Sequence, residues 1–167
     1  MCSSDLIAPV DALAALAAEH DGALIVDEAH ASGVHGAQGR GIAAHLDGQP
    51  HIVSLHTCGK AMGVEGALVC APRILIDYLV NRARSFIFST APSPLIAIAV
   101  EKALERIAQG DELRAALREN IAAVAEHICQ PLGLPAPASQ IVPVILGQDE
   151  RAVAVARSLQ QAGFDVR

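Results

Sequence analysis

Aromatic side chains are scarce in this sequence. It contains no Trp, one Tyr and three Phe, although hydrophobic residues make up 52% of its 167 positions. Much of that share is alanine, which favours helix and buries little surface per residue. The composition therefore excludes a large aromatic core and indicates tightly packed helices.

Clustered positive charge is absent as well. Lys and Arg total 12 against 18 Asp and Glu, which gives a net charge of -6 at pH 7. Nucleic-acid binding depends on clusters of Lys and Arg, and the basic residues here are scattered. We therefore expect no nucleic acid among the partners of this protein.

The sequence also lacks paired cysteines, a long apolar run and a signal peptide. Cys2, Cys58, Cys70 and Cys129 show no zinc or disulfide spacing, so we expect free thiols. No apolar run approaches the roughly 20 residues that a membrane span requires. The first residues have neither the basic head nor the apolar body of a signal peptide. These absences predict a cytoplasmic protein that is not inserted in a membrane.

An alternation of apolar runs and helical patterns is present instead. Short apolar runs predict strands at residues 23–26, 52–55, 66–70 and 140–146, and the start of another at 164–167. The first of these is apolar on both faces, as buried parallel strands are. Helical spacing predicts helices between residues 5 and 21, from 72 to 79, 93 to 110, 111 to 128 and 150 to 162. The alternation indicates an α/β fold with a mainly parallel sheet and helices on its faces, followed by an α+β segment.

Reactive side chains follow the first two predicted strands. Asp27 and His30 leave one strand end, and Thr57 and Lys60 leave the next, where ligands bind in open α/β sheets. Lys60 is either a solvated charge or an amine that forms a Schiff base. Asp27 either caps the following loop or pairs with a protonated pyridine nitrogen. His30 is either a loop histidine or a donor to a cofactor's phenolic oxygen. The combination favours a cofactor site over the separate structural roles.

Five short motifs resemble those of one enzyme family. They are Asp27-Glu28-Ala29-His30, Gly33-Val34-His35-Gly36, Gly39-Arg40-Gly41, Thr57-Cys58-Gly59-Lys60-Ala61-Met62-Gly63 and Phe86-Ile87-Phe88-Ser89-Thr90-Ala91. These motifs are similar to those of the α-oxoamine synthases, fold-type I pyridoxal phosphate enzymes that join an amino acid to an acyl thioester with loss of carbon dioxide. The resemblance implies that residues 1–110 are part of the cofactor-binding large domain. Residues 111–167 would form a linking helix and an incomplete C-terminal small domain.

The resemblance assigns a role to each reactive residue of the first two strand ends. Asp27 would pair with the pyridine nitrogen of pyridoxal 5'-phosphate, and His30 would donate to its phenolic oxygen. Lys60 would hold the cofactor covalently and later remove the alpha proton of the bound amino acid. Thr57 would bind the phosphate. The catalytic residues are thus expected to be Lys60, Asp27 and His30.

The same resemblance implies a partner subunit and a pair of substrates. Ser89 and Thr90 would reach the phosphate of the neighbouring subunit's cofactor, because the family's sites lie at a homodimer interface. Residues 55–70 and 81–94 are most similar to the members that condense L-alanine with pimeloyl thioester in biotin biosynthesis. Family members are considerably longer. They supply a stacking histidine and a carboxylate-binding arginine from segments not in this sequence. We therefore expect an internal fragment that is inactive, or nearly so, by itself.

Three alternatives stay open. Other α-oxoamine synthases, which join glycine to acetyl or succinyl thioester, would share the cofactor residues. A truncated product without catalytic activity would retain them by descent. Metal binding would use a set of histidines and one cysteine: His30, His35, His45, His51, His56 and Cys58. Their spacing lacks the pairs of known metal sites, so no metal is expected.

Overall fold

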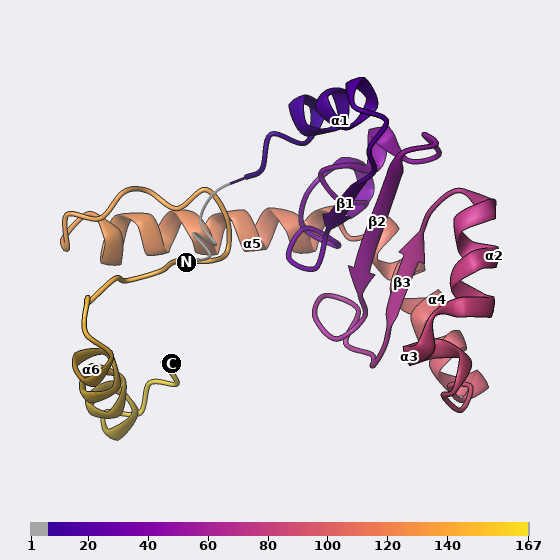
Figure 1. Cartoon of the computed structure of the whole chain (residues 1–167). Coiled ribbons are helices and arrows are strands. Elements are labelled where there is room, and N and C mark those ends of the chain that lie inside the picture. The colour runs from indigo at the N-terminus through magenta and orange to yellow at the C-terminus, as the bar shows by residue number, and fades with distance from the viewer. Residues whose placement is uncertain (1–6, 167) are drawn as a thin grey trace. The chain divides into compact units, whose positions relative to one another are not determined.

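The computed structural model describes residues 7–166, and its sheet has three strands. They are β1 (Leu24–Asp27), β2 (Ile52–Thr57) and β3 (Ala67–Cys70), in that order across the sheet. β1 and β2 are parallel, whereas β3 is antiparallel to β2. Figure 1 shows the three strands side by side. The first three predicted strands are therefore confirmed in place, but the third reverses the parallel direction.

Six α-helices are found in the described part of the chain. They are α1 (Val10–Glu19), α2 (Arg73–Arg82), α3 (Arg84–Ile87), α4 (Pro94–Ala108), α5 (Asp111–Val124) and α6 (Asp149–Gln161). α4 begins where the sequence predicts. Ser93 Oγ accepts from the Leu95 N–H at 3.3 Å, and Pro94 is the first helical residue. The predicted helix start at Asp5 lies outside the described residues. Three short turns complete the set: η1 (Ala37–Gly39), η2 (Ala44–Leu46) and the π-helical η3 (Ala125–Cys129).

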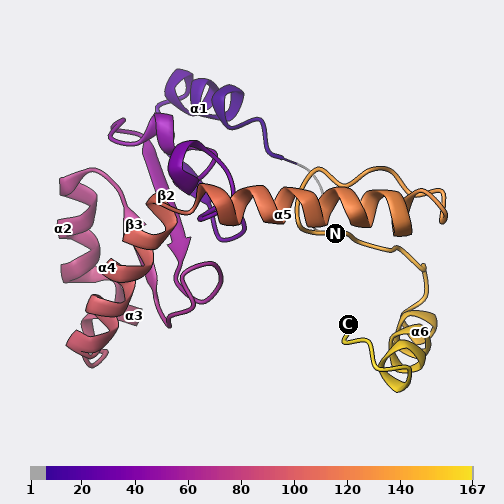
Figure 2. The same ribbon diagram turned by 180° about the vertical axis from the view of Figure 1, so that it is seen from behind.

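The core lies on one face of the sheet and consists of two clusters. The first joins α1 and η2 to the strands: Val10, Ala14, Ala43, Leu46 and Ile52, with Leu24 and Val26 partly buried beside them. The second joins α4 to the turn after β2: Cys58, Met62 and Val100, with Leu68 and Ile107 among their neighbours. In Figure 2, α4 crosses in front of β2 and β3. Small side chains such as alanine let these helices approach the sheet closely.

The opposite face of the sheet is open on its two outer strands among residues 7–166, while Val53 of the central strand is buried there. Ile25 is 70% exposed and Val69 43% exposed, and both lie on strands. The prediction that residues 23–26 are buried on both faces is therefore wrong for this structure. β1 instead alternates between half-buried and exposed side chains, because described elements pack over one of its faces.

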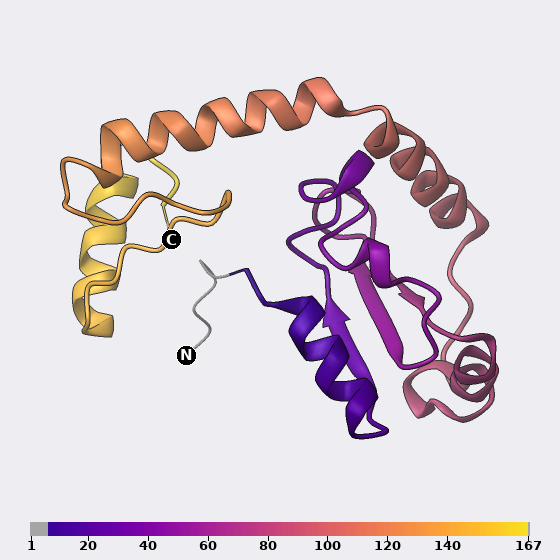
Figure 3. The ribbon, with the colours of Figure 1, turned by 90° about the horizontal axis from the view of Figure 1, so that it is seen from above.

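The chain divides into two compact units, and each is described by itself. The first unit spans Ala8–Arg118, and the second contains the residues from Glu119 onward. In the second unit the extended chain after Pro131 runs beside the end of α5 and leads to α6 (Figure 3). α5 crosses from one unit to the other. The predicted domain division between residues 110 and 111 stays a prediction.

Two strands predicted near the C-terminus are not formed. Residues 140–146 have no strand in the structure, and neither do residues 164–166, while Arg167 lies outside the described residues. Pro143, in the middle of the first run, has no N–H to donate to a ladder. The run is apolar and β-branched, but it pairs with no other described strand. A β-preferring sequence stays irregular when its backbone groups find no partner strand.

The described cysteines agree with one further expectation. Cys58, Cys70 and Cys129 are free thiols, as predicted, while Cys2 lies outside the described residues. Within residues 7–166, no helix has the length and the apolar character needed to cross a membrane.

The contact between α1 and η2 should make stability depend on pH. His45 Nε2 lies 2.5 Å from Asp11 Oδ1, and this hydrogen bond raises the pKa of His45 above its ordinary value of 6.5. A raised folded-state pKa means that the pair stabilises the fold below the unfolded-state pKa and is lost as pH rises through the folded-state value. We expect the melting temperature to fall as pH rises through that window. The loss will be small because both groups are exposed to solvent.

Thermal unfolding of the wild type and of Asp11→Asn, from about pH 5 to about pH 9, measures this effect. In the variant, the melting temperature should no longer fall with pH in the range above the ordinary histidine pKa. An identical slope in both proteins would show that the His45–Asp11 pair does not set it.

Candidate active site

Lys60 and His30 meet at one edge of the sheet. His30 follows β1 and Lys60 follows β2, and parallel strands end at the same edge. Lys60 Nζ lies 2.8 Å from His30 Nε2, so the charged amine, which has N–H donors and no acceptor, donates to the imidazole. Both residues are exposed. An amine and an imidazole are thus in hydrogen-bond contact within reach of a ligand.

Asp27 and Thr57 share one face of the sheet. Asp27 is opposite Leu55 in the parallel register, and residues in register on neighbouring strands point to the same face. Thr57, two residues after Leu55, points to that face as well. One Asp27 oxygen accepts from the Ala29 N–H at 2.9 Å, which is the loop-capping alternative that the sequence allowed. The second carboxylate oxygen is left for a ligand.

Glu28 is a residue of this region whose importance the sequence pattern did not reveal. Its side chain is 2% exposed. Oε1 accepts from the Ala43 N–H at 2.6 Å, and Oε2 accepts from the Ile42 N–H at 3.1 Å. A Cβ added at Gly41 would come within 2.7 Å of this carboxylate. Glu28 therefore holds the glycine loop behind Asp27. The available signal was an acid directly after an apolar strand, where burial requires hydrogen-bond partners.

Ser89 and Thr90 do not lie at the strand ends that carry the other predicted site residues. They follow α3, and both are exposed. Ser89 Oγ donates to the Phe86 carbonyl at 2.7 Å, so its hydroxyl closes the turn after α3. Their predicted role toward a neighbouring subunit stays a prediction.

Cys58 lies between Thr57 and Lys60 but has a packing role. It is 1% exposed and contacts the cluster that contains Met62 and Val100. Burial raises the pKa of the Cys58 thiol, which keeps it protonated and unreactive. Cys58 thus anchors the turn that presents Lys60.

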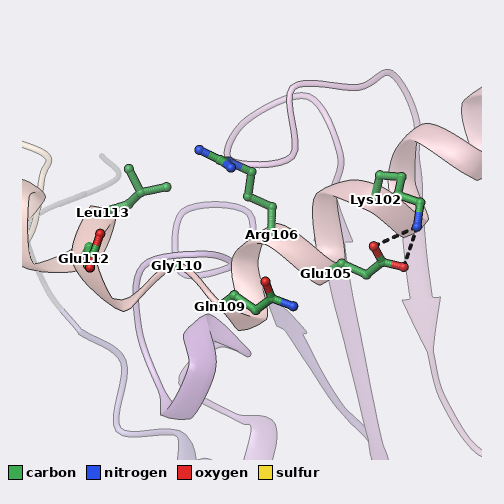
Figure 4. Close-up of a pocket in the computed structure, with 7 residues that line it drawn as sticks. All are labelled: Lys102, Glu105, Arg106, Gln109, Gly110, Glu112 and Leu113. Carbon is green, nitrogen blue, oxygen red and sulfur yellow. Dashed lines mark hydrogen bonds and ion pairs between the residues drawn. The ribbon is translucent and has the colours of Figure 1, made fainter.

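A separate open pocket of about 340 Å³ lies where α4 meets α5. Seven residues line it: Lys102, Glu105, Arg106, Gln109, Gly110, Glu112 and Leu113. Figure 4 shows Lys102 bonded to Glu105, while Arg106 extends away from that pair. None of the predicted site residues lines it. Its mixture of two acids and two cations does not select a ligand, so the strand ends remain the candidate site.

The histidines near the strand ends make contacts other than metal coordination. His30 contacts Lys60, His45 contacts Asp11, and both ring nitrogens of His56 lie near serine hydroxyls. Within residues 7–166, no three or more His, Cys, Asp or Glu side chains gather where they could hold a metal ion.

The sequence of residues 7–166 matches one protein family, the aminotransferases of class I and II. This chain belongs to that family. The match covers both the sheet with its strand-end residues and the helices that follow it. Pyridoxal 5'-phosphate is the cofactor that this family indicates, in agreement with the prediction.

Several curated relatives are named 8-amino-7-oxononanoate synthase. An 8-amino-7-oxononanoate synthase from Ralstonia pickettii is 42% identical over 96% of this chain and 40% of its own length. One from Chromobacterium violaceum is 42% identical over 94% of this chain and 41% of its own length. The chain thus spans about two fifths of the length of the curated relatives it matches. The resemblance to α-oxoamine synthases is confirmed at this level.

Two solved structures show the same fold. The 8-amino-7-oxononanoate synthase of Francisella tularensis superposes with a TM-score of 0.71 at 30% identity, over 90% of this chain and 46% of that one. A serine palmitoyltransferase from S. paucimobilis with bound PLP gives a TM-score of 0.84 at 23% identity, over 97% of this chain and 43% of that one. The prediction of a fold-type I α/β architecture is confirmed.

The side chains at the strand ends fit the chemistry of pyridoxal phosphate. The Lys60 amine suits its aldehyde, and the free oxygen of Asp27 suits a protonated ring nitrogen. The His30 imidazole, beside the amine, suits the phenolic oxygen next to the aldehyde. The Thr57 hydroxyl, on the same face as Asp27, suits a phosphate oxygen. The functional groups at the strand ends are therefore of the types that pyridoxal phosphate requires.

Proposed function

We propose that this chain holds pyridoxal 5'-phosphate at Lys60 and is part of an enzyme that condenses L-alanine with pimeloyl thioester, on CoA or a carrier protein. The reaction would release carbon dioxide and form 8-amino-7-oxononanoate for biotin biosynthesis. The observation that carries the proposal is the 2.8 Å contact between Lys60 Nζ and His30 Nε2 at the shared ends of β1 and β2. The name of the relatives at 42% identity supports alanine and pimeloyl thioester over the glycine-using members.

Each residue of the strand ends has a part in this chemistry. When bound, pyridoxal phosphate supplies an electron sink for the alpha carbon of the amino acid. Lys60 supplies the amine that holds the cofactor, and its Nζ then takes the alpha proton. The Asp27 carboxylate keeps a proton on the ring nitrogen, because an adjacent negative charge favours the charged form. His30 donates to the phenolic oxygen, and the Thr57 hydroxyl donates to the phosphate.

The proposal extends to the assembly and the location of the enzyme. Ser89 and Thr90 are exposed, as residues that serve a neighbouring subunit must be, and this supports a homodimer with the site at its interface. A cytoplasmic location agrees with the resemblance. That these 167 residues alone are inactive, or nearly so, stays a prediction, because the chain spans about two fifths of the relatives' length.

The sequence contains two lysines, Lys60 and Lys102, which makes a direct test of cofactor attachment possible. The purified chain is mixed with pyridoxal phosphate, reduced with borohydride, digested and examined by mass spectrometry. We expect the label on Lys60, because its amine contacts His30 and the proposed roles of His30 and Asp27 would hold the cofactor beside it. Lys102, which is exposed and paired with Glu105 at 2.8 Å, is the internal control.

Lys60→Ala should remove this label and leave the trace at Lys102 unchanged. A label mainly on Lys102, or equal labels on both lysines of the folded wild type, would overturn the proposed attachment site.

A further inference from the structure

Two serines hold both ring nitrogens of His56. Nδ1 lies 2.8 Å from Ser32 Oγ, and Nε2 lies 3.2 Å from Ser54 Oγ. Both serines are buried. Ser32 Oγ also lies 2.9 Å from the Glu28 carbonyl oxygen, and Ser54 Oγ lies 3.3 Å from Asp47 Oδ1. With a neutral ring, one serine accepts from the ring N–H and donates onward, while the other serine donates to the second ring nitrogen. The His56 ring is therefore fixed in a continuous chain of hydrogen bonds.

This chain of hydrogen bonds lies on the far side of β2 from the candidate site. Side chains alternate along a strand, so Ser54 and His56 point to one face while Leu55 and Thr57 point to the other. His56 is thus next to Thr57 in sequence but shares no sheet face with it. Any influence of His56 on the site acts through the backbone and through Ser32.

The His56–Ser32 contact joins the turn after β1 to the end of β2, beyond the last backbone hydrogen bond between these two strands. The Glu28 N–H donates to the Leu55 carbonyl at 2.8 Å, at the end of the β1–β2 pairing. Beyond that point the described hydrogen bonds between the segments come from side chains, among them Ser32 with His56 and Lys60 with His30. Ser32 is two residues after His30, and His56 is four residues before Lys60.

We propose that His56 is a positioning residue of this site. Held by Ser32 and Ser54, it sets the turn that carries His30 against the strand end that carries Lys60. The contact between the Lys60 amine and the His30 imidazole then depends on the His56 ring. This inference rests on the proposed function for its consequence in cofactor attachment, but the positioning itself concerns the chain without cofactor.

The first test needs no cofactor and uses the ring resonances of His30, measured by NMR on the labelled chain. Lys60→Met removes the amine and gives the reference spectrum of a lost contact. We expect His56→Leu and Ser32→Ala each to move the His30 signals toward that reference, while the exposed His20→Leu leaves them in place. His30 signals at wild-type positions in a folded His56→Leu protein would overturn the inference.

The second test uses the ratio of trapped pyridoxal phosphate on Lys60 to that on Lys102. In His56→Leu we expect this ratio to fall about fivefold, the factor that the loss of one hydrogen bond represents. His56→Asn, whose amide can still reach Ser32, should recover part of it. A residue that supports only stability would lower the melting temperature and leave the ratio in the folded protein unchanged.

The two proposals fail in different ways. A wild type that traps no cofactor selectively on Lys60 contradicts the proposed function, and the His30 resonances still decide the role of His56. Selective trapping on Lys60 that His56→Leu does not alter contradicts the role of His56 and leaves the proposed function standing.

Discussion

Replacing Glu28 with alanine should lower the free energy of unfolding by about 3 kcal/mol, since one buried and one half-buried N–H group lose their acceptor at roughly 1–3 kcal/mol each. The carboxylate is 2% exposed, and its oxygens lie 2.6 Å from the Ala43 nitrogen and 3.1 Å from the Ile42 nitrogen. Without it those two amides have no described partner. Urea unfolding followed by circular dichroism measures the loss.

Two variants make this result interpretable. Glu28→Gln keeps one acceptor oxygen but places an NH₂ group opposite the other amide, so its loss should be about half as large. Glu65→Ala, at an exposed loop position, should change the unfolding free energy by less than about 0.5 kcal/mol. If Glu28→Ala and Glu65→Ala lose equal stability, Glu28 does not anchor the loop.

Gly36→Ala should destabilise the chain by about 3 kcal/mol, the size typical of combined backbone strain and overpacking. Gly36 has φ of 75°, a left-handed conformation that L residues with a Cβ rarely adopt. A Cβ there would also come within 2.1 Å of the Gly41 carbonyl oxygen. Because Gly41 itself abuts the Glu28 carboxylate, the backbone cannot move aside without loosening that anchor. Thermal and urea unfolding of the variant test this expectation.

Gly48→Ala is the matched control for Gly36. Gly48 also has a positive φ of 86°, but nothing lies within 4 Å of the position of its added Cβ. We expect it to lose about 1 kcal/mol, from the left-handed backbone alone. Equal losses at the two positions would show that close packing of the glycine loop against Gly41 adds nothing.

The parts of the fold that follow from local rules were predictable. Ser93 and Pro94 specify the start of α4 with side-chain and backbone groups that lie within a few residues of each other. Apolar runs located β1 and β2, and the parallel pairing of those strands placed the reactive residues at one edge. Residues 140–146 show the limit of such rules. A run with strand preference also needs a partner strand, and no local pattern reveals whether one is there.

The sequence by itself determined which reactive side chains stand at the ends of β1 and β2, because strand ends and turns are set by neighbouring residues. It also determined the family, through motifs that keep their order along the chain. Tertiary structure decided the reversed direction of β3, the burial of one face of the sheet, the carboxylate of Glu28 beneath the glycine loop, and the serines on both sides of His56. Several of these features join residues that are distant in the sequence, such as Glu28 with Ala43 and Ser32 with His56. Such contacts depend on how the segments pack, and no short stretch of sequence encodes that packing.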